Sequence, residues 1–196
     1  MIVIKALEEK ILNEGSVLSG NVLKVGSFLN QQIDTEFLKE IGKEIARLYE
    51  NAGVNKIFTI EASGIAIAVA AAFYLDVPVV FAKKGKTSNI SGDVFSTDVE
   101  SFTHGTVYKV IVSKEFIKST DRLLVVDDFL ANGNALKGLF NIISQAGATA
   151  VGAAIAIEKG FQKGGDDLRA AGIRVQSLAI VDSMDDGRVV FRPQNN

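Results

Sequence analysis

Two adjacent acids, Asp127 and Asp128, are the clearest candidates for chemistry in this sequence. They follow the apolar run 123–126, and a short Gly-containing turn leads from them into a helix expected over 135–145. Carboxylate oxygens suit the hydroxyls of a sugar and, directly or through water, Mg²⁺. The first-turn N–H groups of the following helix suit an anion such as phosphate. Acids beside an anion-binding turn therefore indicate a phosphorylated sugar as the ligand.

The elements that must position these acids alternate between strand and helix. Helices are expected over 65–75, 135–145 and 166–171. Short apolar runs predict strands over 57–60, 77–81, 123–126, 151–157 and 175–181. This alternation predicts an α/β fold with a mainly parallel sheet flanked by helices, in which ligands bind at the carboxyl ends of the strands.

The rest of the chain is expected to belong to the same single domain, 1–196. Helices over 4–13 and 35–51, the second capped by Asp34, form an N-terminal cap or hood within 1–53. The polar segment 85–118, with a strand-like run at 107–112, predicts a hairpin or flexible flap inserted between two core strands. Such a flap, closing over the site, would exclude water from the reaction.

The segment 123–140, LLVVDDFLANGNALKGLF, resembles the phosphoribosyl-pyrophosphate (PRPP) motif of type I phosphoribosyltransferases. The commoner family pattern has Thr or Ser hydroxyls around the glycine, and this chain has none there. Phosphate contacts would therefore come from backbone N–H groups and Asn side chains. The residues at this position, which the resemblance assigns to PRPP, are Ala131, Asn132, Gly133, Asn134 and Ala135.

This variant spelling is similar to that of the bacterial xanthine phosphoribosyltransferases, and the similarity runs nearly end to end. It includes the segments GSVLSGNVLKVGSFLNQQID, TIEASGIA, VPVVFAKKGK and IEKGFQ. The resemblance implies the type I phosphoribosyltransferase fold with its hood and flap. It also implies a homodimer.

A second strand-to-helix turn, containing Ala62, Ser63 and Gly64, resembles the pyrophosphate loop of this family. Its backbone N–H groups could hold pyrophosphate, and in the family this loop often contains a cis peptide. A plain turn that uses Gly64 for packing is the alternative. Lys83 and Lys84 are expected to neutralise charge on the pyrophosphate, although a solvated lysine cluster is also typical of such a run.

The purine is expected near Lys159 and Phe161, which follow the apolar run 151–157. Phe161 can stack on a flat base while Lys159 donates to a ring carbonyl or ring nitrogen. The resemblance assigns Lys159 to xanthine, together with Leu23 and Asn30 in the hood. The assignments of Leu23 and Asn30 rest on the resemblance alone.

Composition limits the other chemistry. The chain has no cysteine and one histidine, His104, which is expected to be exposed and incidental, so any metal must be a hard one held by oxygens. Mg²⁺ is expected through pyrophosphate and ribose hydroxyls, with a water-mediated contribution from Asp127 or Asp128 left open. A net charge of −2 gives no general attraction to nucleic acid or anionic membranes. The longest apolar stretch has half of the ~20 residues that a membrane-spanning helix requires, and a cytoplasmic location is expected.

The sequence thus predicts a purine salvage transferase that converts xanthine and PRPP to xanthosine 5'-monophosphate and pyrophosphate, with Asp127 and Asp128 at its centre. One alternative is a non-catalytic PRPP-binding transcription regulator on the same fold. Such regulators usually add a basic winged-helix segment, and the N-terminal 50 residues show no basic face. The other is a transferase for guanine, hypoxanthine or adenine; adenine would need an acceptor for its amine rather than the donor Lys159.

Overall fold

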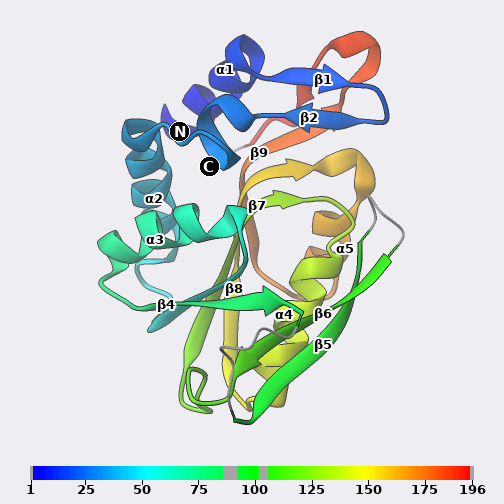
Figure 1. The fold of residues 1–196 in the computed structure, drawn as a ribbon. Coiled ribbons are helices and arrows are strands. Elements are labelled where there is room, and N and C mark those ends of the chain that lie inside the picture. The colour runs from blue at the N-terminus through cyan, green and yellow to red at the C-terminus, as the bar shows by residue number, and fades with distance from the viewer. Residues whose placement is uncertain (1, 86–91, 102–105, 195–196) are drawn as a thin grey trace.

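The computed structural model describes residues 2–85, 92–101 and 106–194. In this part of the chain, eight strands form one central sheet (Figure 1) in the order β10-β9-β8-β7-β3-β4-β6-β5. Neighbouring strands are parallel from β9 to β4 and antiparallel at both edges. The strands are β3 (Lys56–Ile60), β4 (Val79–Lys84), β5 (Val94–Ser101), β6 (Thr106–Ser113), β7 (Arg122–Leu130), β8 (Thr149–Lys159), β9 (Val175–Ser183) and β10 (Val190–Phe191). The predicted α/β class with a mainly parallel sheet is confirmed.

Helices cover both faces of the sheet. On one face lie α1 (Ile2–Glu14), α2 (Thr35–Tyr49) and α3 (Ser63–Leu75), and on the other lie α4 (Asn134–Gln145) and α5 (Gly164–Ala170). The hood consists of α1, the hairpin of β1 (Ser16–Leu18) and β2 (Val22–Lys24), and the π-helical turn η1 (Gly26–Asn30). Two 3₁₀ turns, η2 (Gly160–Gln162) and η3 (Asp185–Gly187), complete the elements.

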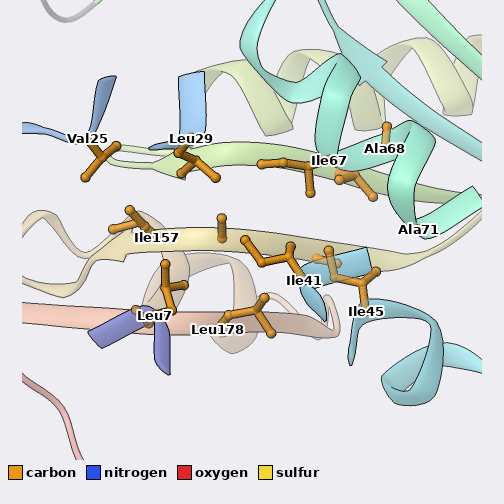
Figure 2. Close-up of a cluster of buried hydrophobic side chains, with 14 of the residues drawn as sticks. Leu7, Val25, Leu29, Ile41, Ile45, Ile67, Ala68, Ala71, Ile157 and Leu178 are labelled. Carbon is orange, nitrogen blue, oxygen red and sulfur yellow. The ribbon is translucent and has the colours of Figure 1, made fainter. Parts of the chain in front are cut away.

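The core has two layers because successive strand side chains point to opposite faces. In β7, Leu124 and Val126 join the layer beneath the hood, α2 and α3, whereas Leu123 and Val125 join the layer beneath α4. Figure 2 shows the first layer, in which side chains from α1, η1, α2 and α3 meet those of β8 and β9. Each fully buried aliphatic side chain contributes roughly 1.5–3 kcal/mol, so these layers fix the hood and helices on the sheet.

Local signals placed most elements correctly. The Asp34 side chain caps α2 as predicted, with its Oδ1 accepting from the Phe37 N–H at 3.1 Å. The strand predicted over 123–126 was too short: β7 continues through both acids to Leu130, because Phe129 and Leu130 still pair with β8. The acids therefore lie inside a strand rather than after it. Likewise, β4 extends to Lys84, so Lys83 and Lys84 belong to the strand and not to the loop that follows.

The predicted insertion 85–118 contains the antiparallel hairpin of β5 and β6, which lies beside α4. Gly138 of α4 leaves room for Val99, since a Cβ there would lie 2.6 Å from a Val99 methyl group. Gln145 Nε2 donates to the Ser96 carbonyl at 2.9 Å. The segments 86–91 and 102–105 of the predicted flap, and with them Lys86 and His104, lie outside the described residues. No helix in the described ranges is long and apolar enough to cross a bilayer.

Candidate active site

The carboxyl ends of β3 and β7 form the point around which the site is built. These strands are neighbours, but β3 leads into α3 on one face of the sheet and β7 leads into α4 on the other. The two strand-to-helix turns therefore lead to opposite faces of the sheet, and open α/β sheets bind ligands at the carboxyl ends of strands that diverge in this way.

Asp127 and Asp128 of β7 lie close to these turns, and both are buried, with 6% and 7% of their surface exposed. The side chain of Asp128 points to the same face of the sheet as that of Val126, toward the hood and α3. Its Oδ2 accepts from Asn30 Nδ2 at 3.0 Å and its Oδ1 accepts from Ser63 Oγ at 2.8 Å. The hood and the first turn thus meet on one carboxylate.

Asp127 has a different environment. Its Oδ1 accepts from the backbone N–H of Asp128 at 3.0 Å. Burial, followed by the charge of Asp128, raises the pKa of Asp127 well above the usual range of a carboxyl group, and Lys84 opposes this shift. Burial and the nearby Asp127 also raise the pKa of Tyr108. The acid pair therefore combines one carboxyl that resists ionisation with one that is held by two neutral donors.

The first turn, from β3 to α3, is filled by protein atoms. Its Glu61–Ala62 peptide bond is cis, a feature that the resemblance suggested but the residues could not reveal. A Cβ at Gly64 would overlap Thr59 Oγ1 and lie 2.9 Å from Asp127 Oδ1. Gly64 is therefore required for close packing of the turn against the acids, and Ser63 beside it donates to Asp128.

The second turn, from β7 to α4, is open. Gly133 has φ +79°, in the left-handed region that glycine adopts without strain, and α4 begins after it without a side-chain cap. Asn134 Nδ2 donates to the Glu100 carbonyl of the hairpin at 3.3 Å. A cavity of about 180 Å³ lies against residues 129–136, Glu100 and Tyr108. All five predicted PRPP residues of this turn, 131–135, line this cavity, whose uncapped helix start suits a phosphate.

The two predicted pyrophosphate lysines do not lie together. The Lys84 N–H donates to Glu61 Oε1 at 2.7 Å, and its Nζ lies 5.4 Å from the centre of the Tyr108 ring, on the side of Asp127. The side chain of Lys83, the residue before Lys84 in the strand, points to the opposite face of the sheet. It lines a separate cavity of about 280 Å³ against β4, β6 and Phe116. The geometry of the strand therefore favours Lys84 over Lys83 for a contact near the acids.

Lys159, at the end of β8, lies on the hood side of the site. Its Nζ donates to the Asn21 carbonyl at 3.0 Å and lies 5.8 Å from the centre of the Phe129 ring. Burial lowers the pKa of Lys159. Phe161 is partly buried against the core layer beneath the hood. A half-buried ammonium between an aromatic ring and a carbonyl is suited to a polar, planar ligand.

Leu23 is buried in β2, with 5% of its surface exposed. It lines a cavity of about 380 Å³ against residues 187–189, which no other predicted site residue lines. The structure thus joins Asn30, Ser63 and both acids by direct contacts, and it leaves the side chain of Leu23 apart from them.

Three residues near the site were missed in the sequence analysis. Tyr108 and Glu100 come from the hairpin and line the cavity at the second turn, but no motif marks them. Phe129 carries a signal that could have been used, because an aromatic residue directly follows the acid pair.

Asp127 and Asp128 are the residues of the site that could supply oxygen ligands to a metal ion. Among residues 2–85, 92–101 and 106–194, no three His, Cys, Asp or Glu side chains gather closely enough to hold a metal ion by themselves. The oxygens of Asp127 and Asp128 suit a hard cation such as Mg²⁺, provided that substrate and water oxygens supply the remaining ligands.

Comparison with known proteins identifies the class. The model of the phosphoribosyl transferase domain matches residues 30–177, which include both turns, the acid pair and Lys159. The chain therefore belongs to the phosphoribosyltransferase family. The fold agrees: an adenine phosphoribosyltransferase structure from Rhodothermus marinus superposes with a TM-score of 0.75 at 17% identity, covering 92% of this chain and 99% of that one.

Curated relatives are much more similar in sequence. A xanthine phosphoribosyltransferase from Lachnoclostridium phytofermentans is 57% identical over 95% of this chain and 97% of its own length. One from Clostridioides difficile is 55% identical over 96% of this chain and 100% of its own length. The resemblance stated from the motifs is confirmed over nearly the whole chain.

Proposed function

We propose that this protein transfers the 5-phosphoribosyl group of PRPP to xanthine, forming xanthosine 5'-monophosphate and releasing pyrophosphate. The observation that carries the proposal is the acid pair between two strand-to-helix turns, with Asn30 of the hood bonded to Asp128. The base is chosen from the relatives named xanthine phosphoribosyltransferase.

The residues of the second turn hold the 5-phosphate in this proposal. Backbone N–H groups of 131–135 surround a cavity at the uncapped start of α4, where the helix dipole favours an anion. Asp127 and Asp128 accept hydrogen bonds from the ribose hydroxyls. The first turn, with Ala62, Ser63 and Gly64, and the ammonium of Lys84 hold the pyrophosphate.

The chemical step exchanges one bond at C1 of the ribose for another. The bond between C1 and the pyrophosphate oxygen breaks, and its electron pair leaves with pyrophosphate. A purine ring nitrogen forms the new bond to C1, and its proton is released to solvent water. Because C1 becomes positive during the exchange, the nearby carboxylate of Asp128 stabilises the transition state electrostatically.

We propose Mg²⁺ as the cofactor, bound through pyrophosphate and ribose hydroxyls, with Asp127 or Asp128 holding it through water. When bound, this cation neutralises charge on the departing pyrophosphate. The chain's own part would be to supply carboxylate oxygens, for which the acid pair beside the two turns is the proposed source.

The base site discriminates between purines by its hydrogen-bond donors. Lys159 offers an ammonium donor to a ring carbonyl, as xanthine requires, whereas the exocyclic amine of adenine needs an acceptor. The adenine phosphoribosyltransferases among similar structures share only 16–22% identity and support the fold alone. The regulator alternative finds little support, because residues 2–53 form the hood and α2 rather than a basic winged helix.

We also propose that the protein forms a homodimer and is located in the cytoplasm. Large apolar side chains are exposed on α3, on β4 and in the connection between β6 and β7, with Phe73 81%, Phe81 40% and Phe116 52% exposed. An exposed apolar surface of this kind favours a protein contact, and a second copy of this chain is the proposed occupant.

Nucleotide formation from PRPP and Mg²⁺ tests the proposal, with xanthine, guanine, hypoxanthine and adenine offered separately at equal concentration. We expect xanthine to give the highest kcat/KM. Lys159→Gln should reduce kcat/KM for xanthine, whereas Lys43→Gln, an exposed change on α2, should not. Guanine or hypoxanthine reacting faster would reassign the base, and no product with any base would favour the regulator.

A further inference from the structure

A charged side chain lies completely buried behind the active site. Glu158, the residue before Lys159 in β8, has 0% of its surface exposed. Its two oxygens accept from Arg169 of α5, at 2.9 Å from Nη1 and 2.6 Å from Nη2, and the Ser177 hydroxyl of β9 donates to the same carboxylate. We call Glu158, Arg169 and Ser177 the Glu158 cluster. A buried ion pair commonly stabilises a fold no more than apolar side chains of the same size would, so stability alone is a weak reason for it.

The cluster supports the start of α5. A Cβ at Gly165 would overlap the Glu158 carboxylate, so the backbone of this helix turn lies directly on the buried charge. Arg169, four residues further along α5, grips the same carboxylate in a bidentate arrangement that fixes its orientation. The start of α5 and Arg169 therefore both contact the Glu158 carboxylate.

The other side of the same helix turn contacts the second turn, whose residues 131–133 we call the phosphate loop. The Gly164 N–H donates to the Ala131 carbonyl at 3.1 Å, and a Cβ at Gly164 would lie 2.6 Å from the carbonyl carbon of Asn132. Leu168 of α5 reaches within 3.4 Å of the Cβ position of Gly133. The start of α5 is thus enclosed between the Glu158 carboxylate and loop 131–133.

An outer set of ion pairs ties this arrangement to the end of the sheet. Asp166 of α5 accepts from Arg192 at 2.9 Å, and Arg192 also donates to Asp182 of β9 at 2.9 Å. Asp166 lies 3.4 Å from Arg169 as well. The outer pairs are more exposed and contribute little by themselves, but they share Arg169 with the buried cluster.

We propose that Glu158 and Arg169 are positioning residues, which hold the phosphate loop 131–133 and the base residue Lys159 at a fixed separation through α5. The inference rests on the proposed function of that loop and of Lys159. Neither residue touches a substrate: Glu158 acts on Lys159 through the backbone of β8 and on the loop through Gly164 and Gly165. A small displacement of groups that bind a reactant lowers the rate strongly even when the fold survives.

The test replaces the ion pair by apolar side chains in the full chain. The double variant Glu158→Leu with Arg169→Leu should remain folded, because it leaves no unpaired buried charge. We expect its kcat/KM for PRPP to fall about tenfold to a hundredfold, with a cooperative thermal unfolding transition. Arg169→Lys keeps the cation but cannot make both bonds, so it should show a smaller fall in the same direction.

A matched control separates positioning from stability. Lys56 and Asp121 form an ion pair that is equally short, at 2.6 Å, and mostly buried at the start of β3, at the opposite end of the sheet. Lys56→Met should lower the midpoint of thermal unfolding and leave kcat and both KM values unchanged. Folded double and Arg169→Lys variants with wild-type kcat/KM would overturn the inference.

Failure of the proposed function gives a different result. A wild-type protein that makes no nucleotide from xanthine would contradict the proposed function and leave the loop to be tested by PRPP binding alone. Calorimetry with PRPP would then decide: weaker binding by the double variant supports positioning by the Glu158 cluster, and equal binding overturns it.

Discussion

The two turns at the carboxyl ends of β3 and β7 have the same local design, but one is filled by protein atoms and the other borders a cavity. Each follows a buried parallel strand and opens a helix beside the acid pair. The first turn is filled, since Gly64 packs against Thr59 and Asp127. The second turn is open, since Gly133 leaves a cavity along the start of α4.

The difference shows how one structural unit serves two purposes. In the filled turn, protein atoms satisfy and fix the acids, with Ser63 donating to Asp128. In the open turn, backbone N–H groups at the helix start are left for a ligand. The side chains of the filled turn therefore fix the acids, and its backbone is proposed to hold pyrophosphate, whereas the open turn is proposed to hold the 5-phosphate.

The largest effect on activity is expected from a change at Asp128, which lies close to both turns. Asp128→Asn removes the charge that the filled turn holds in place, and we expect kcat/KM for PRPP to fall about a hundredfold or more, as for other electrostatic groups at a transition state. The free energy of unfolding should change by less than about 1.5 kcal/mol, because the amide oxygen keeps one hydrogen bond. Steady-state kinetics and urea denaturation measure the two effects.

The control is Asp98→Asn, a charge removal on the exposed side of the hairpin, 4.0 Å from Lys109. It should change neither quantity. Normal turnover by Asp128→Asn would remove this carboxylate from the mechanism.

Much of this comparison could be predicted from the sequence, because it depends on local signals. Apolar runs of strand length, the cap at Asp34 and the glycines at 64 and 133 placed the strands, α2 and both turns. The acid pair followed from two carboxylates after a run of four apolar residues. These features depend on neighbours within a few positions along the chain.

The contacts that complete the site could not be predicted, because they depend on how distant elements dock. Asn30 lies 98 residues from Asp128 and meets it only when the hood packs on the sheet. The separation of Lys83 from Lys84 depends on how far β4 extends, which is set by pairing with β6. Arg169 and Glu158 belong to different elements, and no local pattern relates them.

The next largest effect is expected on stability, from substitutions of Gly64 in the filled turn and Gly133 in the open turn. Gly64→Ala forces a Cβ into Thr59 and Asp127, and we expect a destabilisation of about 1–3 kcal/mol with a loss of activity, because overpacked atoms must move. Gly133→Ala has space, with its nearest neighbour at 3.4 Å, but it places an alanine in the left-handed region at a cost of about 1–2 kcal/mol.

Gly133→Asn distinguishes the two causes, because Asn adopts the left-handed conformation more readily than Ala. We expect Gly133→Asn to be more stable than Gly133→Ala in thermal denaturation, whereas Gly64→Asn should be no better than Gly64→Ala. Equal stability of the two Gly133 variants would contradict a conformational origin.

Asp127 predicts a pH dependence of stability. Its folded-state pKa is raised by burial and by Asp128, so the unfolded chain releases this proton at a lower pH than the folded chain. Stability therefore falls as pH rises from the unfolded pKa to the folded one and is fully present only below both. Asp127→Asn removes this loss, and we expect it to be more stable than the wild type at neutral pH, with the advantage shrinking as the pH approaches 4.

Asp34 provides a control of opposite sign. The bond from Lys10, followed by the Phe37 N–H, lowers the pKa of Asp34, so its stabilisation is present above the unfolded pKa and is lost as pH falls. Asp34→Asn should be less stable than the wild type at neutral pH. Denaturant titrations test the pair, between about pH 4 and 7 for Asp127→Asn and from neutral pH to below about pH 4 for Asp34→Asn. A pH-independent difference for Asp127→Asn would contradict the shift.

The smallest effects are expected from the two neutral donors to Asp128. Ser63→Ala and Asn30→Ala each remove one hydrogen bond, of 2.8 Å and 3.0 Å. The net loss is about 1 kcal/mol, or roughly fivefold in kcat/KM for PRPP. The two variants should differ in their KM for xanthine. Asn30 belongs to the hood and is proposed to contact xanthine, so only Asn30→Ala should also raise this KM. An equal rise in both variants would mean that the filled turn, and not only the hood, orders the base site.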